Sequence, residues 1–402
     1  MKDNKTRIHI NELRIGMYVS ELDRPWEKTP FDKGFIIQSR EELADLRDCC
    51  TYAYIDVDKQ KRQYGAIPTT LTKETDRVAF NKAFDTATES YQTTSTFVKN
   101  AIEDLRFGNK LDAKVAKEAV SDCVNQVLDN SDTMKLLTQL KNMDEYTSQH
   151  SLNVCILSIL LGKHLKLSAD KLNKLGLCGL LHDMGKSKIP LEILNKEGKL
   201  IGKEMEIMKS HATLGKNILL NTPDIEQEVI DAAYSHHERL NGTGYPRGLE
   251  SDEISAFTKI VSIVDTYDAI TSDRVYQKGK LHLQAIEILV DGRNTEFDSN
   301  LVIRFIECIG VYPVGSPVEM TNGEVVMVIE SNPSNRIKPK VLLLLDEHKK
   351  PQKEKLIDLS LPSAIDKNGK PYKLSKVLKQ DAYNLNLRKY HEKGFLVRCM
   401  EA

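Results

Sequence analysis

The sequence lacks an excess of charge, a long apolar run and a signal-peptide core. Its 57 Lys and Arg residues are balanced by 58 Asp and Glu residues, so no global field favours nucleic acid or an anionic membrane. No apolar run reaches about 18 residues, the length that marks a membrane span. The first residues, MKDNKTRIHI, contain no apolar core. We therefore expect neither a membrane span nor a polymeric nucleic acid partner, although a local basic pocket stays open.

A cysteine framework is also missing. The seven cysteines are odd in number and scattered, and only Cys49 and Cys50 lie close together. No CxxC pair suggests a structural zinc site, and no regular spacing suggests a set of disulfides. The expectation is a chain with reduced thiols in the cytoplasm.

Changes of pattern divide the 402 residues into four parts, because a chain of this length is long for one core. Glycine and proline are rare in the second part, where apolar residues recur at helical spacing. That part either links domains or pairs with a copy of itself to form a homodimer. In chain order the parts are a small α+β domain at 1–65, a helical linker at 66–130, an all-α domain at 131–310, and a β-rich appendage with a polar tail at 311–402.

Local signals place the elements inside these parts. Ser39, with Glu42 three residues on, predicts the start of a short helix between β-like segments. Thr321-Asn322-Gly323 predicts the turn of a β-hairpin, and 340–347 reads as a further strand. In the all-α part a loop rich in Gly and Asn is expected at 241–248. Helices are expected at 146–166, 168–184, 203–220, 225–238, 252–272 and 281–292.

Histidine and aspartate are concentrated in the all-α part. Six of the ten histidines fall between His150 and His237. Imidazole and carboxylate are the ligand types of a divalent transition-metal site. The adjacent His236 and His237 would repel each other as cations, whereas coordination to a metal keeps both neutral. The clustering makes this part a candidate metalloenzyme domain.

Each position has a structural alternative when it is taken alone. The pair His182-Asp183 can mark an exposed helix end. His211 shares an apolar helix face and can be an ordinary core residue. Asp265 lies in a strongly apolar helix, where a salt bridge with Arg274 would explain its burial. The metal-site interpretation therefore depends on the positions together.

Six short segments of the all-α part stand out: DEYTSQHS at 144–151, LLHDMGKSKIP at 180–190, ILNKEGKL at 193–200, HATLG at 211–215, HHERLNGTGYP at 236–246 and DTYDAITSDRVY at 265–276. Taken together, these motifs resemble those of the HD-GYP phosphodiesterases, a subgroup of the HD metal-dependent phosphohydrolases. Residues 1–65 resemble a DUF3391-type domain, and YPVGSPVEMTNGE resembles the β appendage found after such catalytic domains. The resemblance implies a multi-domain α+β protein with an HD-type helical bundle as its catalytic domain.

The resemblance also implies roles for single residues. Asp183 would bridge two metals, either iron or manganese, and would share the catalytic role with Lys186. Lys186 and Arg274 would contact substrate phosphates, and Tyr245 would line or gate the pocket. Tyr146 stands where some relatives have a glutamate that binds a third metal, so we expect two metals rather than three. The implied ligands are His150, His182, Asp183, His211, His236, His237 and Asp265.

The function that the resemblance implies is hydrolysis of a cyclic dinucleotide to the linear dinucleotide, with mononucleotides as a further product in some members. Cyclic di-GMP is the first substrate to test, and 3'3'-cyclic GMP-AMP stays open as an alternative. A second hypothesis is a non-catalytic signalling module that binds the dinucleotide, or a diguanylate cyclase-type partner through the Gly-Tyr-Pro surface. A one-metal HD nucleotidase is disfavoured by His211, His236 and His237.

Overall fold

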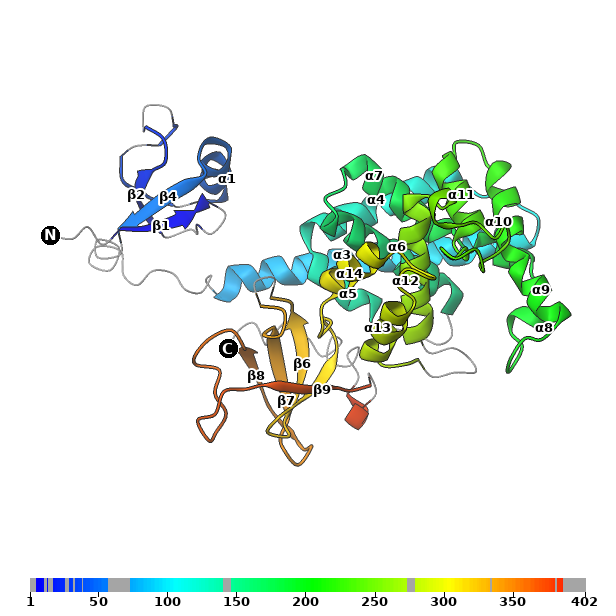
Figure 1. Cartoon of the computed structure of the whole chain (residues 1–402). Helices are drawn as coiled ribbons and strands as arrows, with labels where there is room; N and C mark the ends of the chain where they lie inside the picture. Colours follow the sequence, from blue (N-terminus) through cyan, green and yellow to red (C-terminus); the bar gives the residue numbers. More distant parts are fainter. Residues whose placement is uncertain are drawn as a thin grey trace. The chain divides into compact units, whose positions relative to one another are not determined.

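The computed structural model describes residues 5–10, 13, 17–25, 29–31, 33–37, 39–56, 73–139, 146–272, 279–332, 335–379 and 382–385. The chain divides into two compact units, Met1–Ala79 and Phe80–Ala402. Figure 1 shows a small sheet near the N-terminus, a large group of helices, and a second sheet towards the C-terminus. These elements confirm the expected multi-domain α+β class with an all-α bundle.

The first unit carries a four-stranded antiparallel sheet in the order β1-β4-β2-β3. Helix α1 (Arg40–Cys49) begins where predicted, because the Ser39 side chain accepts a hydrogen bond from the backbone N–H of Glu42 at 3.1 Å. Leu46 of this helix is fully buried among strand residues of the same core. The strands are β1 (Lys5–His9), β2 (Tyr18–Leu22), β3 (Phe35–Ile36) and β4 (Tyr52–Asp56).

A long helix, α3 (Lys73–Arg106), follows and confirms the helical spacing read from the sequence. The side of α3 that carries Tyr91, Thr94 and Val98 is buried. Two helices continue from it, α4 (Ala113–Asp129) and α5 (Ser131–Thr138). The Asp112 side chain caps α4 by accepting hydrogen bonds from the N–H groups of Lys114 and Val115.

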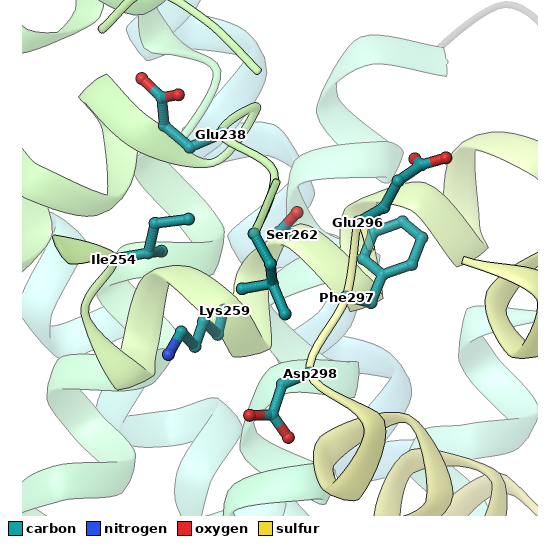
Figure 2. A pocket seen from close by; sticks show the side chains of 8 residues that line it. Glu238, Ile254, Lys259, Ser262, Glu296, Phe297 and Asp298 are labelled. Carbon is teal, nitrogen blue, oxygen red and sulfur yellow. The ribbon is translucent and has the colours of Figure 1, made fainter. Parts of the chain in front are cut away.

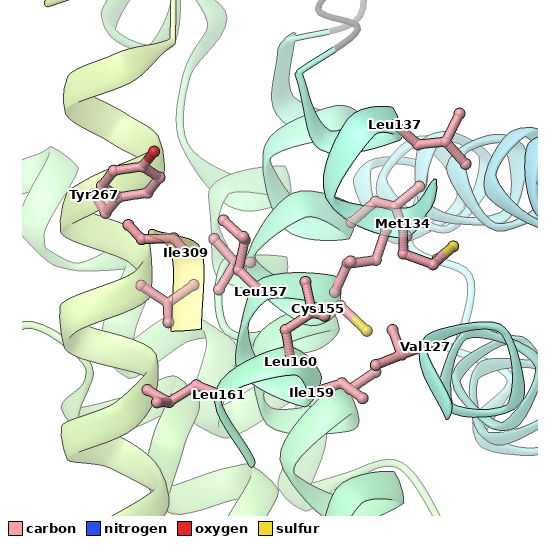
Figure 3. Close-up of a cluster of buried hydrophobic side chains, with 14 of the residues drawn as sticks. Val127, Met134, Leu137, Cys155, Leu157, Ile159, Leu160, Leu161, Tyr267 and Ile309 are labelled. Carbon is pink, nitrogen blue, oxygen red and sulfur yellow. The ribbon is translucent and has the colours of Figure 1, made fainter. Parts of the chain in front are cut away.

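Helix α6 (Tyr146–His164) is the centre of the bundle. All of its residues from 148 to 162 are buried, and it packs against α7 (Ala169–Leu181) and α12 (Ala256–Thr271). The helix is buried on every side because it has neighbours on every side. Figure 3 shows Leu157 and Leu161 of α6 and Tyr267 of α12 within one cluster of buried side chains.

Shorter elements surround these helices. The helix predicted at 203–220 is in fact two, α9 (Lys203–Lys209) and α10 (His211–Leu220). Ser210 lies at the break, and its hydroxyl donates to the carbonyl of Ile207, an alternative to regular helical bonding. The remaining elements are η5 (Met184–Lys188), α8 (Leu191–Leu194), α11 (Gln227–Ser235), η6 (Ser251–Glu253), α13 (His282–Asp291) and α14 (Ser299–Ile309).

The C-terminal part is a five-stranded antiparallel sheet in the order β8-β7-β6-β5-β9. The predicted hairpin is present: β5 pairs with β6, and Gly323 in the turn has a φ of 85°. No helix within the described ranges is long and apolar enough to cross a membrane. The strands are β5 (Pro317–Met320), β6 (Val325–Glu330), β7 (Lys340–Leu345), β8 (Pro351–Asp358) and β9 (Leu374–Val377), and the short turn η7 (Ala382–Asn384) follows them.

Candidate metal centre

The seven residues predicted as ligands meet in one place, although they come from separate elements. Six of them are buried, and His237 is partly buried. His150 lies on α6 and Asp265 on α12, and the other five lie at helix ends. Helix ends bring side chains to one point because several helices can terminate there together. The five are His182 and Asp183 after α7, His211 at the start of α10, and His236 and His237 after α11.

The two oxygens of Asp183 face two different pairs of histidines. Oδ2 lies 3.2 Å from Nε2 of His182 and 3.6 Å from Nε2 of His150. Oδ1 lies 3.4 Å from Nε2 of His211 and 3.8 Å from Nε2 of His236. A carboxylate placed in this way can share its two oxygens between two cations.

Asp265 completes the cluster on the other side. Its Oδ1 lies 3.1 Å from Nε2 of His150 and 3.8 Å from Nε2 of His182. Its Oδ2 lies 3.9 Å from Nδ1 of His237. Three overlapping sets of residues each place their ligand atoms within 4.8 Å of one another. These sets are His150, His182 and Asp183; His182, His236 and Asp265; and His211, His236 and His237.

Backbone carbonyls orient three of the imidazole rings. Nδ1 of His182 lies 2.8 Å from the carbonyl of Gly179, and Nδ1 of His211 lies 2.7 Å from that of Met208. Nδ1 of His236 lies 3.1 Å from the carbonyl of Ala233. Since a carbonyl only accepts, Nδ1 carries the proton and the lone pair of Nε2 points into the cluster. This is the tautomer that a metal ligand requires.

Two buried atoms of the cluster have no hydrogen-bond partner within the described part of the chain, Nε2 of His182 and Oδ1 of Asp183. A buried polar atom left unpaired costs about 1–3 kcal/mol. A divalent cation at the centre would satisfy both atoms. The donors are imidazole nitrogens and carboxylate oxygens, and no cysteine belongs to any of the three sets, so the cluster fits a borderline-to-hard divalent ion.

The electrostatics of the cluster agree with this fit. Burial lowers the pKa of His236 to about 3 and also lowers the pKa of His211, so both rings are neutral. Burial would raise the pKa of Asp183, but His182 and Lys186 hold it well below its usual range. Burial would lower the pKa of His150, yet the nearby carboxylates of Asp265 and Asp268 raise it to about 9. These carboxylates favour a positive charge beside them. A bound metal ion would provide that charge in place of the proton on His150.

The Gly-Tyr-Pro loop closes one side of the cluster. Tyr245 stacks on the ring of His237, and the ammonium of Lys209 lies 4.9 Å from the centroid of the Tyr245 ring. A Cβ on Gly244 would lie 2.4 Å from Cα of Glu238, so only glycine allows the loop to approach so closely. The carboxylate of Glu238 in turn accepts hydrogen bonds from the N–H groups of Arg247 and Leu249 and holds the loop in place. Figure 2 shows a small pocket lined by Glu238 and by Ser262 and Phe297; none of the seven clustered residues lines it.

The structure describes only some of the residues that the sequence analysis named around the cluster. The ammonium of Lys186 donates a hydrogen bond to Oδ2 of Asp183, and its contact with a substrate phosphate stays a prediction. Arg274, the side chain of Tyr146, and Glu145 lie outside the described residues. No role was predicted for Lys209 or Asp268. In the structure Asp268 faces His150, at 2.8 Å from Nδ1.

These features define a helical bundle with a buried cluster of histidine and aspartate residues that is compatible with divalent metal ions, the arrangement of an HD-type hydrolase domain. Residues 131–301 match a family model described as an HD domain. Residues 5–116 match a domain of unknown function, DUF3391, and residues 317–373 match a KOW domain associated with the HD domain.

Similarity to curated proteins extends over nearly the whole chain. The chain is 33% identical over 375 residues to the cyclic di-GMP phosphodiesterase PA4108 of Pseudomonas aeruginosa. The aligned region covers 90% of each of the two chains. The chain therefore belongs to the HD-domain cyclic dinucleotide phosphodiesterase family of that protein, and the predicted resemblance is confirmed.

Other relatives match a smaller share of the chain. A 3'3'-cGAMP-specific phosphodiesterase 3 of Vibrio cholerae is 33% identical over 169 residues, which is 42% of this chain and 36% of that protein. A cyclic di-GMP phosphodiesterase of Thermotoga maritima is 36% identical over 169 residues, which is 42% of this chain and 45% of that protein. Among solved structures, the HD-GYP protein Bd1817 of Bdellovibrio bacteriovorus covers 75% of this chain and 98% of its own, with 20% identity and a TM-score of 0.47.

Proposed function

We propose that the protein hydrolyses a cyclic dinucleotide to the linear dinucleotide at a centre of two divalent metal ions, with cyclic di-GMP as the first substrate. The observation that carries the proposal is the placement of Asp183, whose two carboxylate oxygens each face a separate pair of imidazole nitrogens. The relative that matches 90% of the chain is named for cyclic di-GMP, and a relative that matches 42% of the chain is named for 3'3'-cGAMP. The second dinucleotide is therefore the alternative substrate.

The residues divide between the two proposed ions. One ion would be held by His150, His182 and Asp265, and the other by His211, His236 and His237, with Asp183 shared between them. We propose iron or manganese, since nitrogen and oxygen donors without thiolate suit these ions. When bound, such a pair supplies Lewis acidity and lowers the pKa of water to near neutrality.

The side chains around the centre would bind and enclose the substrate. Lys186 hydrogen-bonds to Asp183 but keeps part of its ammonium side chain exposed, so it can reach a substrate phosphate as a point charge. Tyr245 stacks on His237, and Lys209 lies over the Tyr245 ring on the Gly-Tyr-Pro side of the centre. Arg274 is proposed as a second phosphate contact on the sequence resemblance alone. Burial of the six innermost ligands keeps bulk water away from the centre and strengthens charge interactions there.

The test is to incubate the purified full-length protein with Mn²⁺ or Fe²⁺ and each dinucleotide, and to separate the products by chromatography. We expect linear product from cyclic di-GMP, and none from an Asp183→Ala variant. Asp170→Asn, at an exposed position of α7, is the matched control and should keep full activity. Absence of linear product from both dinucleotides refutes the hydrolase, and tight binding without product would support the non-catalytic signalling module.

Three further expectations belong to this proposal. We propose a cytoplasmic protein, a homodimer formed through the helical stretch 66–130, and a diguanylate cyclase-type partner at the Gly-Tyr-Pro surface. Light scattering of the purified chain tests the dimer. Co-purification with a cyclase, compared between the wild type and a Tyr245→Ala variant, tests the partner.

A further inference from the structure

We infer that Tyr91 of helix α3 is a positioning residue for His150, so that the long helix before the catalytic bundle takes part in holding the metal centre. The inference rests on the metal centre proposed above. It concerns a residue outside the HD domain match that contains the ligands, and it follows from a chain of buried hydrogen bonds.

The chain of contacts begins at the ligand. Nδ1 of His150 lies 2.8 Å from Oδ2 of Asp268, on the side of the ring away from the cluster. The amide nitrogen of Asn153 donates to Oδ1 of Asp268 at 3.2 Å. The hydroxyl of Tyr91 donates to the amide oxygen of Asn153 at 3.0 Å. All four side chains are buried.

Asp268 sets the orientation and basicity of His150. Because the carboxylate accepts from Nδ1, the proton stays on that nitrogen and Nε2 keeps its lone pair for a cation. Carboxylate partners behind a ligating histidine fix the ring and raise its affinity for the metal. The hydroxyl of Ser272 donates to the same Oδ2 at 3.1 Å, so the carboxylate is held from two directions.

Asn153 connects Tyr91 to Asp268 through two hydrogen bonds. Its amide nitrogen also faces the carbonyl of Thr138 at 3.4 Å, and both of these acceptors need the nitrogen end of the amide. The hydroxyl of Tyr91 occupies the oxygen end. Removal of that hydroxyl would leave a buried amide oxygen without this donor and free the amide to turn, which would weaken its hold on Asp268.

Tyr91 belongs to a different part of the chain from the residues that it holds. It lies within the stretch 5–116 that matches the DUF3391 family model, whereas His150, Asn153 and Asp268 lie within the HD domain match of 131–301. Helix α3 begins at Lys73, before the boundary between the two compact units, and it carries Tyr91 in the second unit. A displacement of α3 would therefore change the position of His150, one of the proposed metal ligands.

The matched pair of variants is Tyr91→Phe and Thr94→Val. Each removes one buried hydroxyl from the same face of α3, and Thr94 contacts Cys123 of α4 rather than a residue of the metal centre. The measurement is Mn²⁺ binding to the full-length, metal-stripped proteins, followed by the electron paramagnetic resonance of free Mn²⁺. Thermal unfolding of the same samples measures the purely structural effect.

We expect Tyr91→Phe to raise the Kd of one Mn²⁺ by about three- to thirtyfold, somewhat less than the loss of a direct partner of a ligating histidine. Thr94→Val should leave both Kd values within about twofold of the wild type. Its Tm should fall by about as much as the Tm of Tyr91→Phe. Saturating Mn²⁺ should restore the kcat of Tyr91→Phe, since the fault lies in metal occupancy. In an Asn153→Ala background the effect of Tyr91→Phe on the Kd should vanish, because the two residues act in series.

Three results would overturn the inference: an unchanged Kd in Tyr91→Phe, an equal change in Thr94→Val, or a full effect of Tyr91→Phe in the Asn153→Ala background. If the wild type itself binds no Mn²⁺, the proposed metal centre fails, and this inference fails with it. If the wild type binds two Mn²⁺ but hydrolyses neither dinucleotide, only the proposed substrate fails.

Discussion

Tyr245 stacks on the imidazole of His237, with ring centroids 4.7 Å apart and an angle of 29° between the planes. His237 is the most exposed of the seven clustered residues, so the tyrosine covers the ring that bulk water could otherwise reach. The Gly-Tyr-Pro loop is thus part of the wall of the proposed metal centre.

The stacking predicts that the ring of Tyr245 matters more than its hydroxyl. Tyr245→Phe keeps the ring and should retain kcat/KM within about threefold, whereas Tyr245→Ala should lose about ten- to a hundredfold, since misplaced groups commonly cost that much. Steady-state kinetics with cyclic di-GMP and Mn²⁺ measure both. Equal losses in the two variants would instead assign the effect to the hydroxyl.

Lys186 should act on substrate rather than on metal retention. Lys186→Gln removes the charge and is expected to lower kcat/KM by about a hundredfold, the scale seen when one electrostatic contact to the transition state is lost. The variant should still bind metal, because Lys186 donates to Asp183 but is not itself a ligand. Metal content by mass spectrometry, measured beside the kinetics, separates the two effects. Loss of metal from Lys186→Gln would show that the lysine serves to hold Asp183.

Gly185 should tolerate no side chain. A Cβ at this position would lie 1.9 Å from the carbonyl oxygen of His211 and 2.5 Å from the amide nitrogen of Gly215. Backbone cannot yield easily, so Gly185→Ala should cost about 3 kcal/mol of unfolding free energy, the upper end for overpacking. The clash also separates Asp183 from His211, so Mn²⁺ binding should weaken. Urea unfolding tests the first effect, with Glu192→Ala on the exposed side of α8 as the control. Unchanged stability would contradict the close approach of η5 and α10.

His282 should make the protein sensitive to mild acid even without metal. Burial lowers its pKa to about 4; its Nδ1 accepts from the hydroxyl of Tyr267, and its Nε2 donates to the carbonyl of Gly310. Between about pH 6.5 and 4 the unfolded chain takes up a proton that the folded chain refuses, so stability falls as the pH falls. Over that range the wild type should lose about 3 kcal/mol more than His282→Gln, which keeps a donor and an acceptor.

Urea unfolding of the two metal-stripped proteins at several pH values measures this difference. Parallel pH profiles for the wild type and His282→Gln would mean that the ring is protonated in the folded state.

Elements with strong local signals were predictable from the sequence. The cap at Ser39 and the turn at Gly323 form where predicted, because each depends on residues within three or four positions of one another. The break at Ser210 was missed, since nothing in the apolar spacing of 203–220 marks it. The wall of the site was predicted in part: Tyr245 stands in a motif, whereas Lys209 does not.

The sequence by itself determined which residues are candidates for the metal centre, because the histidines and aspartates stand in short motifs that resemble those of one family. Only the tertiary structure decided how they are used. It placed the two oxygens of Asp183 against separate histidine pairs, and it joined Tyr91, Asn153, Asp268 and His150 into one buried network. The successive contacts of that network span 62, 115 and 118 residues of sequence. Local periodicity cannot encode such contacts, because they depend on how α3, α6 and α12 pack together.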